Sequence, residues 1–337
     1  LMGGITNGRN NSTGTVYDVY GDLGYDIITV SDYMWINRDS VHRSDFIPVY
    51  EHGYSLRKTH QVLIGAEEVT WFDYPLFQTR HAKQHIINRL REHNDIIALA
   101  HPLLRNGYSI EDMRYLTGYE MIEVMNRYAM SWEHWDAALS AGKPVFMLAN
   151  DDAHDLAEPM EAGRMVSVLN CSPVNRKNVV EALRHGRLHA FRAQLPWEDP
   201  VPVLRQSHKK LPKIMSIQTE GPQVKMSFDE YLYQVILIGQ GGDTIRVERF
   251  ADSIRTKHYH YTFNPEDTYI RAMVEFKDYD KIFLNPIFRT QDGLLPKIPT
   301  PTVNMIKTIV YRGIVWILIL VFARWRWRLR KLRKARL

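Results

Sequence analysis

The chain has 337 residues, 45% of them hydrophobic, a formal net charge of +5 and one cysteine, Cys171. This length allows one large domain and a smaller one, and a single cysteine excludes an intramolecular disulfide framework. The positive excess lies in the segment from Arg324 onward and the remaining chain is slightly acidic, which argues against nucleic-acid binding by the body.

From residue 26 to about residue 190, short apolar segments alternate with helical ones. The predicted strands are 26–30, 62–66, 96–100, 121–125, 145–149 and 165–169. Nearly continuous apolar strands separated by helices indicate a parallel sheet covered on both faces. Such a sheet forms either a barrel or a doubly wound sheet, and we assign residues 1–200 to this first domain.

The segment 201–292 has a different pattern. Strand-like stretches such as YQVILIGQ, TIRVERF and HYHYTF follow one another with turn residues between them. This pattern indicates a small antiparallel β-sandwich as a second domain. Residues 293–302 are rich in proline and are predicted to form a stalk.

Residues 303–323 form the most apolar segment of the chain. Only Lys307 and Arg312 are charged here, and the length is close to the roughly 20 residues that span a bilayer. We predict a single transmembrane helix followed by a basic tail, 324–337. The positive-inside rule places the tail in the cytoplasm and the preceding domains on the extracytoplasmic side. The alternative is an amphipathic helix that lies on a membrane or on a partner.

Polar side chains follow or occupy the ends of five predicted strands. These are Ser31-Asp32-Tyr33, Glu67-Glu68, His101, Glu123 with Asn126, and Asn150-Asp151-Asp152 with His154. Because the C-terminal ends of parallel strands converge on one face, these groups favour a shared site there. Carboxylates and imidazoles without cysteine suit Zn, Mn or Fe. Each group alone is also compatible with a helix cap, a core histidine or surface charge.

The stretches GYDIITVSDY, LIGAEEVT, IALAHP, GYEMIEVMN and NDDAHD resemble, in this order, successive motifs of the PHP (polymerase and histidinol phosphatase) superfamily. In that family they read approximately as TDH, PGEEV, AHP, G-hydrophobic-E-hydrophobic-N and GSDAH. The resemblance covers residues 1 to about 195. Its most specific parts are the AHP and D-x-H elements.

This resemblance implies a distorted (β/α)7 barrel that binds divalent metal ions and hydrolyses phosphate esters with metal-activated water. Residue by residue, it implies that Glu68, His101, Asp152 and His154 are metal ligands, and that the first three are also catalytic. The implied substrate is a phosphorylated small molecule or polymer, and the implied metal is Zn, Mn or Fe.

The chain departs from the family at three ligand positions. Gly3 and Ile5 stand where the family has an H-x-H motif, and Tyr33 replaces the histidine of TDH. We therefore expect fewer than three bound ions. The histidines that could substitute are His42, His52, His60, His81 and His85, of which the last two share a helix face. No signal peptide is recognisable, and we expect further sequence, with a possible H-x-H of its own, to precede Leu1.

These observations leave three functional hypotheses. The first is a membrane-anchored, metal-dependent phosphoesterase, favoured by the retained Glu68, His101, Asp152 and His154. The second is a catalytically inactive PHP-fold protein that binds a ligand or partner, favoured by the replaced ligands. The third is a surface module in which the sandwich binds and the barrel is a scaffold. Metal content discriminates the first from the others.

Overall fold

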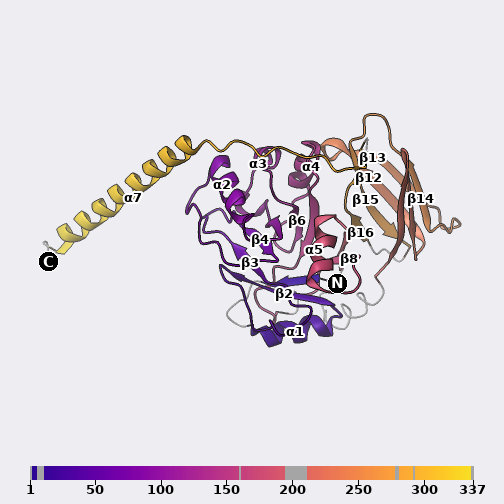
Figure 1. Cartoon of the computed structure of the whole chain (residues 1–337), viewed down its shortest axis with the longest axis horizontal. Coiled ribbons are helices and arrows are strands. Elements are labelled where there is room, and N and C mark those ends of the chain that lie inside the picture. The colour runs from indigo at the N-terminus through magenta and orange to yellow at the C-terminus, as the bar shows by residue number, and fades with distance from the viewer. Residues whose placement is uncertain are drawn as a thin grey trace.

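A computed structural model describes residues 2–5, 11–158, 161–193, 211–277, 281–290 and 293–334, without the side chains of residues 2–5 and 332–334. One curled sheet runs through the body, and a long helix, α7, projects away from it (Figure 1). The hydrogen-bonded strands follow the order β13-β12-β15-β16-β9-β8-β1-β2-β3-β4-β5-β6-β7.

The N-terminal part of this sheet has mixed strand directions. β1, β2 and β3 are parallel, β4 is antiparallel to both β3 and β5, and β5, β6 and β7 are parallel. On the other side of β1, β8 and β9 are antiparallel. The strands are β1 (Met2–Ile5), β2 (Ile27–Tyr33), β3 (Val49–His52), β4 (Gln61–Ile64), β5 (Ile96–Leu99), β6 (Met121–Asn126), β7 (Phe146–Asn150), β8 (Met165–Leu169) and β9 (Leu188–Arg192).

The predicted (β/α)7 barrel is therefore wrong. The sheet is a curled half-barrel of mixed strands, because β4 turns back against β3 instead of crossing over to run parallel to it. A parallel connection needs roughly a dozen residues or more, and the connection 53–60 is shorter than that. The sequence pattern missed β3 because this buried strand contains Glu51 and His52 and is not a purely apolar run.

Among the described residues of this part, five α-helices lie between the strands. Ser12, Thr79 and Asn175 cap α1, α2 and α5, since each side-chain oxygen accepts a backbone N–H three residues further on. The buried face of α5 consists of Val179, Val180, Ala182 and Leu183. The helices are α1 (Thr13–Asp22), α2 (Arg80–Leu90), α3 (Ile110–Tyr115), α4 (Trp132–Ser140) and α5 (Arg176–Arg184).

The C-terminal strands form two layers, and one of them continues the N-terminal sheet. β16 pairs with β9, so that β16, β15, β12 and β13 extend the large sheet. A second sheet, β10-β11-β14, packs on this extension through a shared core that includes Val224, Met226, Val235, Leu237 and Val274. The strands are β10 (Ile214–Glu220), β11 (Gln223–Phe228), β12 (Leu232–Ile238), β13 (Thr244–Arg249), β14 (His258–Thr262), β15 (Tyr269–Phe276), β16 (Lys281–Leu284) and β17 (Ile287–Phe288).

A buried ion pair connects α4 to β15. The Arg271 guanidinium donates two hydrogen bonds of 2.7 Å to the Asp136 carboxylate, and both side chains are buried. The guanidinium carbon also lies 5.3 Å from the ring centroids of Trp132 and of Trp135. The two parts of the chain are thus joined by a charge pair as well as by the continuous sheet.

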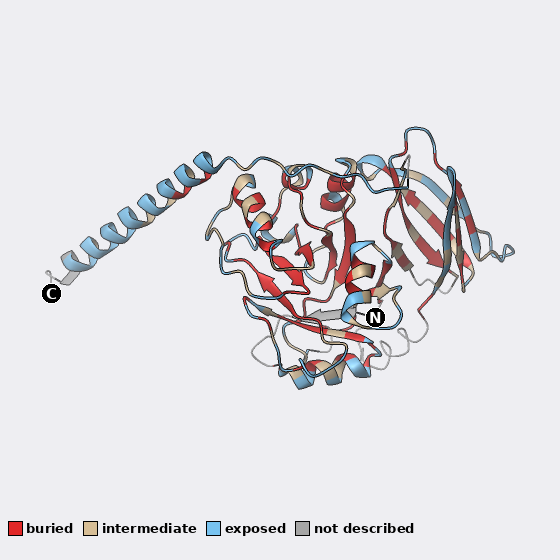
Figure 2. Ribbon diagram, in the orientation of Figure 1, coloured by how far each residue is buried: buried red, intermediate tan, exposed pale blue. Residues whose placement is uncertain are grey.

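Helix α7 (Met305–Lys334) contains the predicted membrane segment. Its most apolar window, within Met305–Lys331, has a mean hydropathy of 2.0 and is 11% buried, so by length and composition the helix could cross a membrane. Figure 2 shows that most of the helix surface is exposed. The helix continues beyond residue 323 into the basic tail. Its orientation in a membrane stays a prediction.

We expect Arg271→Ala to lower the free energy of unfolding by about 3–5 kcal/mol, because it leaves the Asp136 carboxylate buried and unpaired. The measurement is urea unfolding of the detergent-solubilised full chain, followed by its tryptophan fluorescence. The control is Arg246→Ala, which breaks the exposed pair with Glu248 and should cost less than about 1 kcal/mol. Equal losses for the two variants would contradict the role given to the buried pair.

Candidate metal centre

Glu51, His60 and His101 lie together in the interior of the body. One ligand atom of each side chain lies within 4.8 Å of the other two, and all three residues are buried. The Glu51 carboxylate accepts a hydrogen bond from His60 Nδ1, and its Oε1 lies 3.4 Å from His101 Nε2. The two imidazole ring centroids are 5.3 Å apart. We call this group the Glu51–His60–His101 cluster.

The cluster forms because β4 runs against its neighbours. Glu51 lies near the C-terminal end of β3, and His101 follows the C-terminal end of β5. His60 directly precedes β4. Since β4 is antiparallel to both other strands, its N-terminal end lies at the same edge of the sheet as their C-terminal ends.

Two further carboxylates occupy the same edge, Glu123 of β6 and Asp152 after β7. Asn126 Nδ2 donates to Glu123 Oε2 at 3.0 Å and to Asp152 Oδ2 at 3.2 Å. Glu123 Oε2 also accepts the backbone N–H of His101 at 2.8 Å. These contacts connect the two carboxylates to each other and to the turn that carries His101.

The buried charges of this region shift the pKa values of one another. Burial alone would raise the pKa of Glu51, but the charges and hydrogen bonds of His60 and His101 hold it below its usual value. Burial, strengthened by the nearby Asp152 charge, raises the pKa of Glu123 to about 7. Burial and the Glu51 charge likewise raise the pKa of Asp152. Three carboxylates therefore share a space in which a cation would lower the cost of their ionisation.

His101 and Asp152 both have left-handed backbone conformations, with φ of 29° and 50°. For a residue with a Cβ atom, such a conformation costs on the order of 1–3 kcal/mol and persists where the surroundings impose it. Each residue lies just past the end of its strand, β5 or β7. The strain is thus located at the two turns that bring these side chains to the cluster.

The donor set of the cluster fits a divalent transition metal. Two imidazoles and one carboxylate are a combination found in catalytic zinc sites, which leave a position open for water or substrate. His101 Nδ1 is buried and has no hydrogen-bond partner among the described residues. Such an unsatisfied buried nitrogen is unusual and can mark the place of an ion or ligand. The cluster could hold a metal ion, and the choice among Zn, Mn and Fe stays a prediction.

The structure places Glu68 away from this cluster. Glu68 follows the C-terminal end of β4, which the reversed direction of the strand puts at the opposite edge of the sheet. There its carboxylate lies 3.2 Å from His93 Nε2, and 65% of the Glu68 side chain is exposed. The carboxylate that meets His101 is Glu51.

His154 lies beside Asp152 but outside the cluster. Its side chain is 48% exposed, and its Nδ1 lies 2.8 Å from the Asp152 carbonyl and 3.3 Å from the Tyr128 hydroxyl. The neighbouring Asp151 has a structural role, since its buried carboxylate accepts the backbone N–H groups of 163–165 and the Tyr20 hydroxyl. Of the four ligands that the resemblance implies, His101 is in the cluster, Asp152 and His154 are near it and Glu68 is remote.

Among the histidines proposed as substitutes, His60 belongs to the cluster. His81 and His85 instead contact Tyr115 and Tyr74 at 3.1 and 2.7 Å. Tyr33, at the position of the family's TDH histidine, lies at the margin of the cluster with its ring centroid 5.5 Å from that of His60. Gly3 and Ile5 belong to β1, where side chains are outside the described part of the chain.

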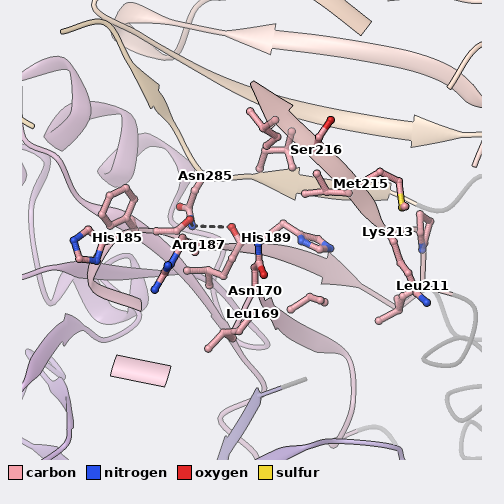
Figure 3. Close-up of a pocket in the computed structure, with 18 of the residues that line it drawn as sticks. Leu169, Asn170, His185, Arg187, His189, Leu211, Lys213, Met215, Ser216 and Asn285 are labelled. Carbon is pink, nitrogen blue, oxygen red and sulfur yellow. Dashed lines mark hydrogen bonds between the residues drawn. The ribbon is translucent and has the colours of Figure 1, made fainter. Parts of the chain in front are cut away.

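A cavity of about 820 Å³ lies elsewhere, between the strands β8 and β9 and the start of β10 (Figure 3). His189 lines it together with Arg187, Lys213 and several apolar side chains. Burial lowers the pKa of His189 to about 4, which keeps its imidazole neutral at pH 7. The cavity includes no residue of the Glu51–His60–His101 cluster. This cavity is therefore separate from the candidate metal centre.

Comparison of the sequence with family models found no match. Comparison with curated proteins and with solved structures found none either. The functional assignment therefore depends on the residues and geometry described above.

We expect the full chain to bind a divalent metal ion that His60→Ala removes, because the variant loses one of three ligands. The measurement is elemental analysis after supplementation with Zn, Mn or Fe and removal of unbound ion. The matched control is His93→Ala, which deletes an imidazole that also contacts a glutamate but lies at the opposite edge. Loss of metal from both variants, or from neither, would contradict the assignment of the cluster.

Proposed function

We propose that the chain is a membrane-anchored, metal-dependent hydrolase of phosphate esters. The observation that carries this proposal is the buried Glu51–His60–His101 cluster. A second observation supports the proposal. Asn126 donates hydrogen bonds to the carboxylates of Glu123 and Asp152 and holds both at the same edge of the sheet. The choice of phosphate esters is supported by the resemblance of the AHP and D-x-H motifs to those of the PHP superfamily.

In this proposal a bound divalent metal would supply an activated water molecule and offset charge on the phosphoryl oxygens. The groups of the chain itself hold and orient the ligands. The His60–Glu51 hydrogen bond fixes the ring of His60 and the rotamer of Glu51. Glu123 fixes the backbone of His101 through the N–H that it accepts. Such supporting contacts commonly change metal affinity or activity about 10- to 100-fold when they are removed.

Residues beside Asp152 offer a place for the phosphate group of a substrate. Tyr128 is 47% exposed and the His154 side chain 48%, whereas the Arg127 side chain is 19% exposed. The guanidinium carbon of Arg127 lies 4.4 Å from the ring centroid of Tyr128, whose hydroxyl is 3.3 Å from His154 Nδ1. Arg127 also pairs with Glu161 at 2.8 Å, which holds the cation in position. On the side of His60, the partly exposed ring of Tyr33 borders the cluster. We propose that an anionic substrate approaches between Arg127 and Tyr33.

One observation favours the alternative, a ligand-binding protein without turnover. Glu51, His60 and His101 contact one another directly. Burial alone would lower the pKa of His101. The hydrogen bond to Glu51 and the negative charges of Glu123 and Glu51 outweigh this effect and raise that pKa to about 9. In the absence of a metal, Glu51 and a protonated His101 would thus form a buried ion pair. This alternative predicts no bound metal and no hydrolysis.

For the proposed hydrolase, we expect Glu51→Gln to lower kcat about 100-fold or more, because the neutral amide is a poorer metal ligand. The assay uses the full chain in detergent with p-nitrophenyl phosphate and its diester as probes, after loading with Zn, Mn or Fe. Glu68→Gln is the matched control and should keep at least about half of the activity, since Glu68 is exposed at the opposite edge.

Two outcomes would contradict the proposal. One is a wild-type chain that retains metal but hydrolyses neither probe, which favours the inactive alternative. The other is equal loss of activity in Glu51→Gln and Glu68→Gln, which would place the reactive site elsewhere.

A further inference from the structure

An exposed aromatic segment, residues 71–77, contacts the loop 53–60 that carries His60. Six of its seven residues are apolar or aromatic, in the sequence WFDYPLF. The exposed fractions of Trp71, Phe72 and Phe77 are 62%, 36% and 49%, and Leu56 beside them is 57% exposed. Contiguous apolar surface of this kind usually marks contact with another molecule or with a membrane.

The aromatic segment is fixed to the body by backbone contacts. Leu56 N donates to the Leu76 carbonyl at 3.2 Å, and the Tyr54 N–H donates to the Asp73 carboxylate. The Phe72 carbonyl lies 3.0 Å from His52 Nε2. The exposed side chains therefore stand on a segment held at several points.

The same segment is in contact with the first turns of α7. Arg312 Nη1 donates to the Pro75 carbonyl at 2.6 Å, and its guanidinium carbon lies 4.6 Å from the Tyr74 ring centroid. Thr308 and Arg312 are buried there, whereas the helix beyond them is mostly exposed. The aromatic segment is thus adjacent to the first turns of α7, which leaves the body beside α2 (Figure 1).

This point coincides with the start of the uninterrupted apolar run of the helix, 313–323, directly after Arg312. If α7 spans a bilayer, Arg312 is at the boundary of the hydrocarbon, where long cationic side chains extend toward the polar headgroups. Aromatic side chains at that level are typical of the membrane interface. Tyr74 and Pro75 contact Arg312 and therefore lie at the same depth relative to the bilayer.

We infer that residues 71–77, together with Leu56 and Arg57, form a membrane-contacting surface that lies on the bilayer beside α7. Trp71, Phe72, Phe77 and Leu56 provide the apolar contacts. The Arg57 guanidinium carbon is 5.5 Å from the Phe77 ring centroid and supplies a cation for lipid phosphate groups. The contact does not depend on catalysis. The membrane contact of residues 71–77 holds the loop 53–60 close to the lipid headgroups, and His60 lies at the end of this loop.

Site-specific lipid quenching tests this inference on the full chain. In a Cys171→Ser background, Trp71→Cys and Phe77→Cys each receive an environment-sensitive fluorophore. The chain is placed in nanodiscs of phosphatidylcholine and phosphatidylglycerol, with or without spin-labelled phosphatidylcholine. Met215→Cys is the distant control, because Met215 is 64% exposed but lies on β10. Ile314→Cys, two residues past Arg312 in the apolar run of α7 and 52% exposed, is the positive control.

We expect spin-labelled lipid to quench the probes at 71 and 77 several-fold more than the probe at 215, and about as strongly as the probe at 314. Quenching at 314 without quenching at 71 and 77 would overturn the inference. Protection of 71 and 77 from aqueous iodide without quenching by lipid would also overturn it, because a protein or a second copy of the chain would then cover the surface.

Discussion

The antiparallel course of β4 is the constraint on which the candidate metal centre depends. A short connection turns the chain back after β3, so that the start of β4 meets the ends of β3 and β5. Glu51, His60 and His101 come together as a result, although they lie on or next to strands of opposite direction. The same reversal removes Glu68 to the other edge of the sheet. If β4 ran parallel to its neighbours, Glu68 would approach His101 and His60 would leave it.

The second feature of the centre is the concentration of buried charge that follows from this arrangement. Glu51, Glu123 and Asp152 share a region of low solvent exposure with two imidazoles. Burying ionised carboxylates is costly unless a cation or hydrogen bonds compensate them. Here the compensation is partial, since burial raises the pKa of Glu123 and of Asp152. The left-handed turns at His101 and Asp152 add strain at the same place. A fold that tolerates both features at one edge is consistent with a functional site there.

The sequence predicted part of this centre. It identified most strands of the N-terminal sheet, the edge at which polar residues gather, and His101 as a member of the site. The sequence offered His60 only as a possible replacement ligand. A residue that precedes a strand of a parallel sheet is expected at the edge opposite the C-terminal strand ends, where the site was predicted. Glu51 was missed, since its strand is short and carries charge; the nearby turn at Gly53 and the pair His52 and His60 were the available signals. The prediction of a parallel barrel was wrong because apolar runs alone do not reveal the direction of a strand. The apolar helix was found because its length and composition depend on local sequence.

The central proposal is that Glu51, His60 and His101 bind one metal ion. The most direct test is a crystal structure of the full chain grown with Zn²⁺, with diffraction data collected on both sides of the zinc absorption edge. The account predicts an anomalous peak about 2.0–2.2 Å from a nitrogen of each imidazole and from a Glu51 oxygen. A peak between Glu68 and His93, or an intact Glu51–His60 hydrogen bond with no peak beside it, would contradict the account.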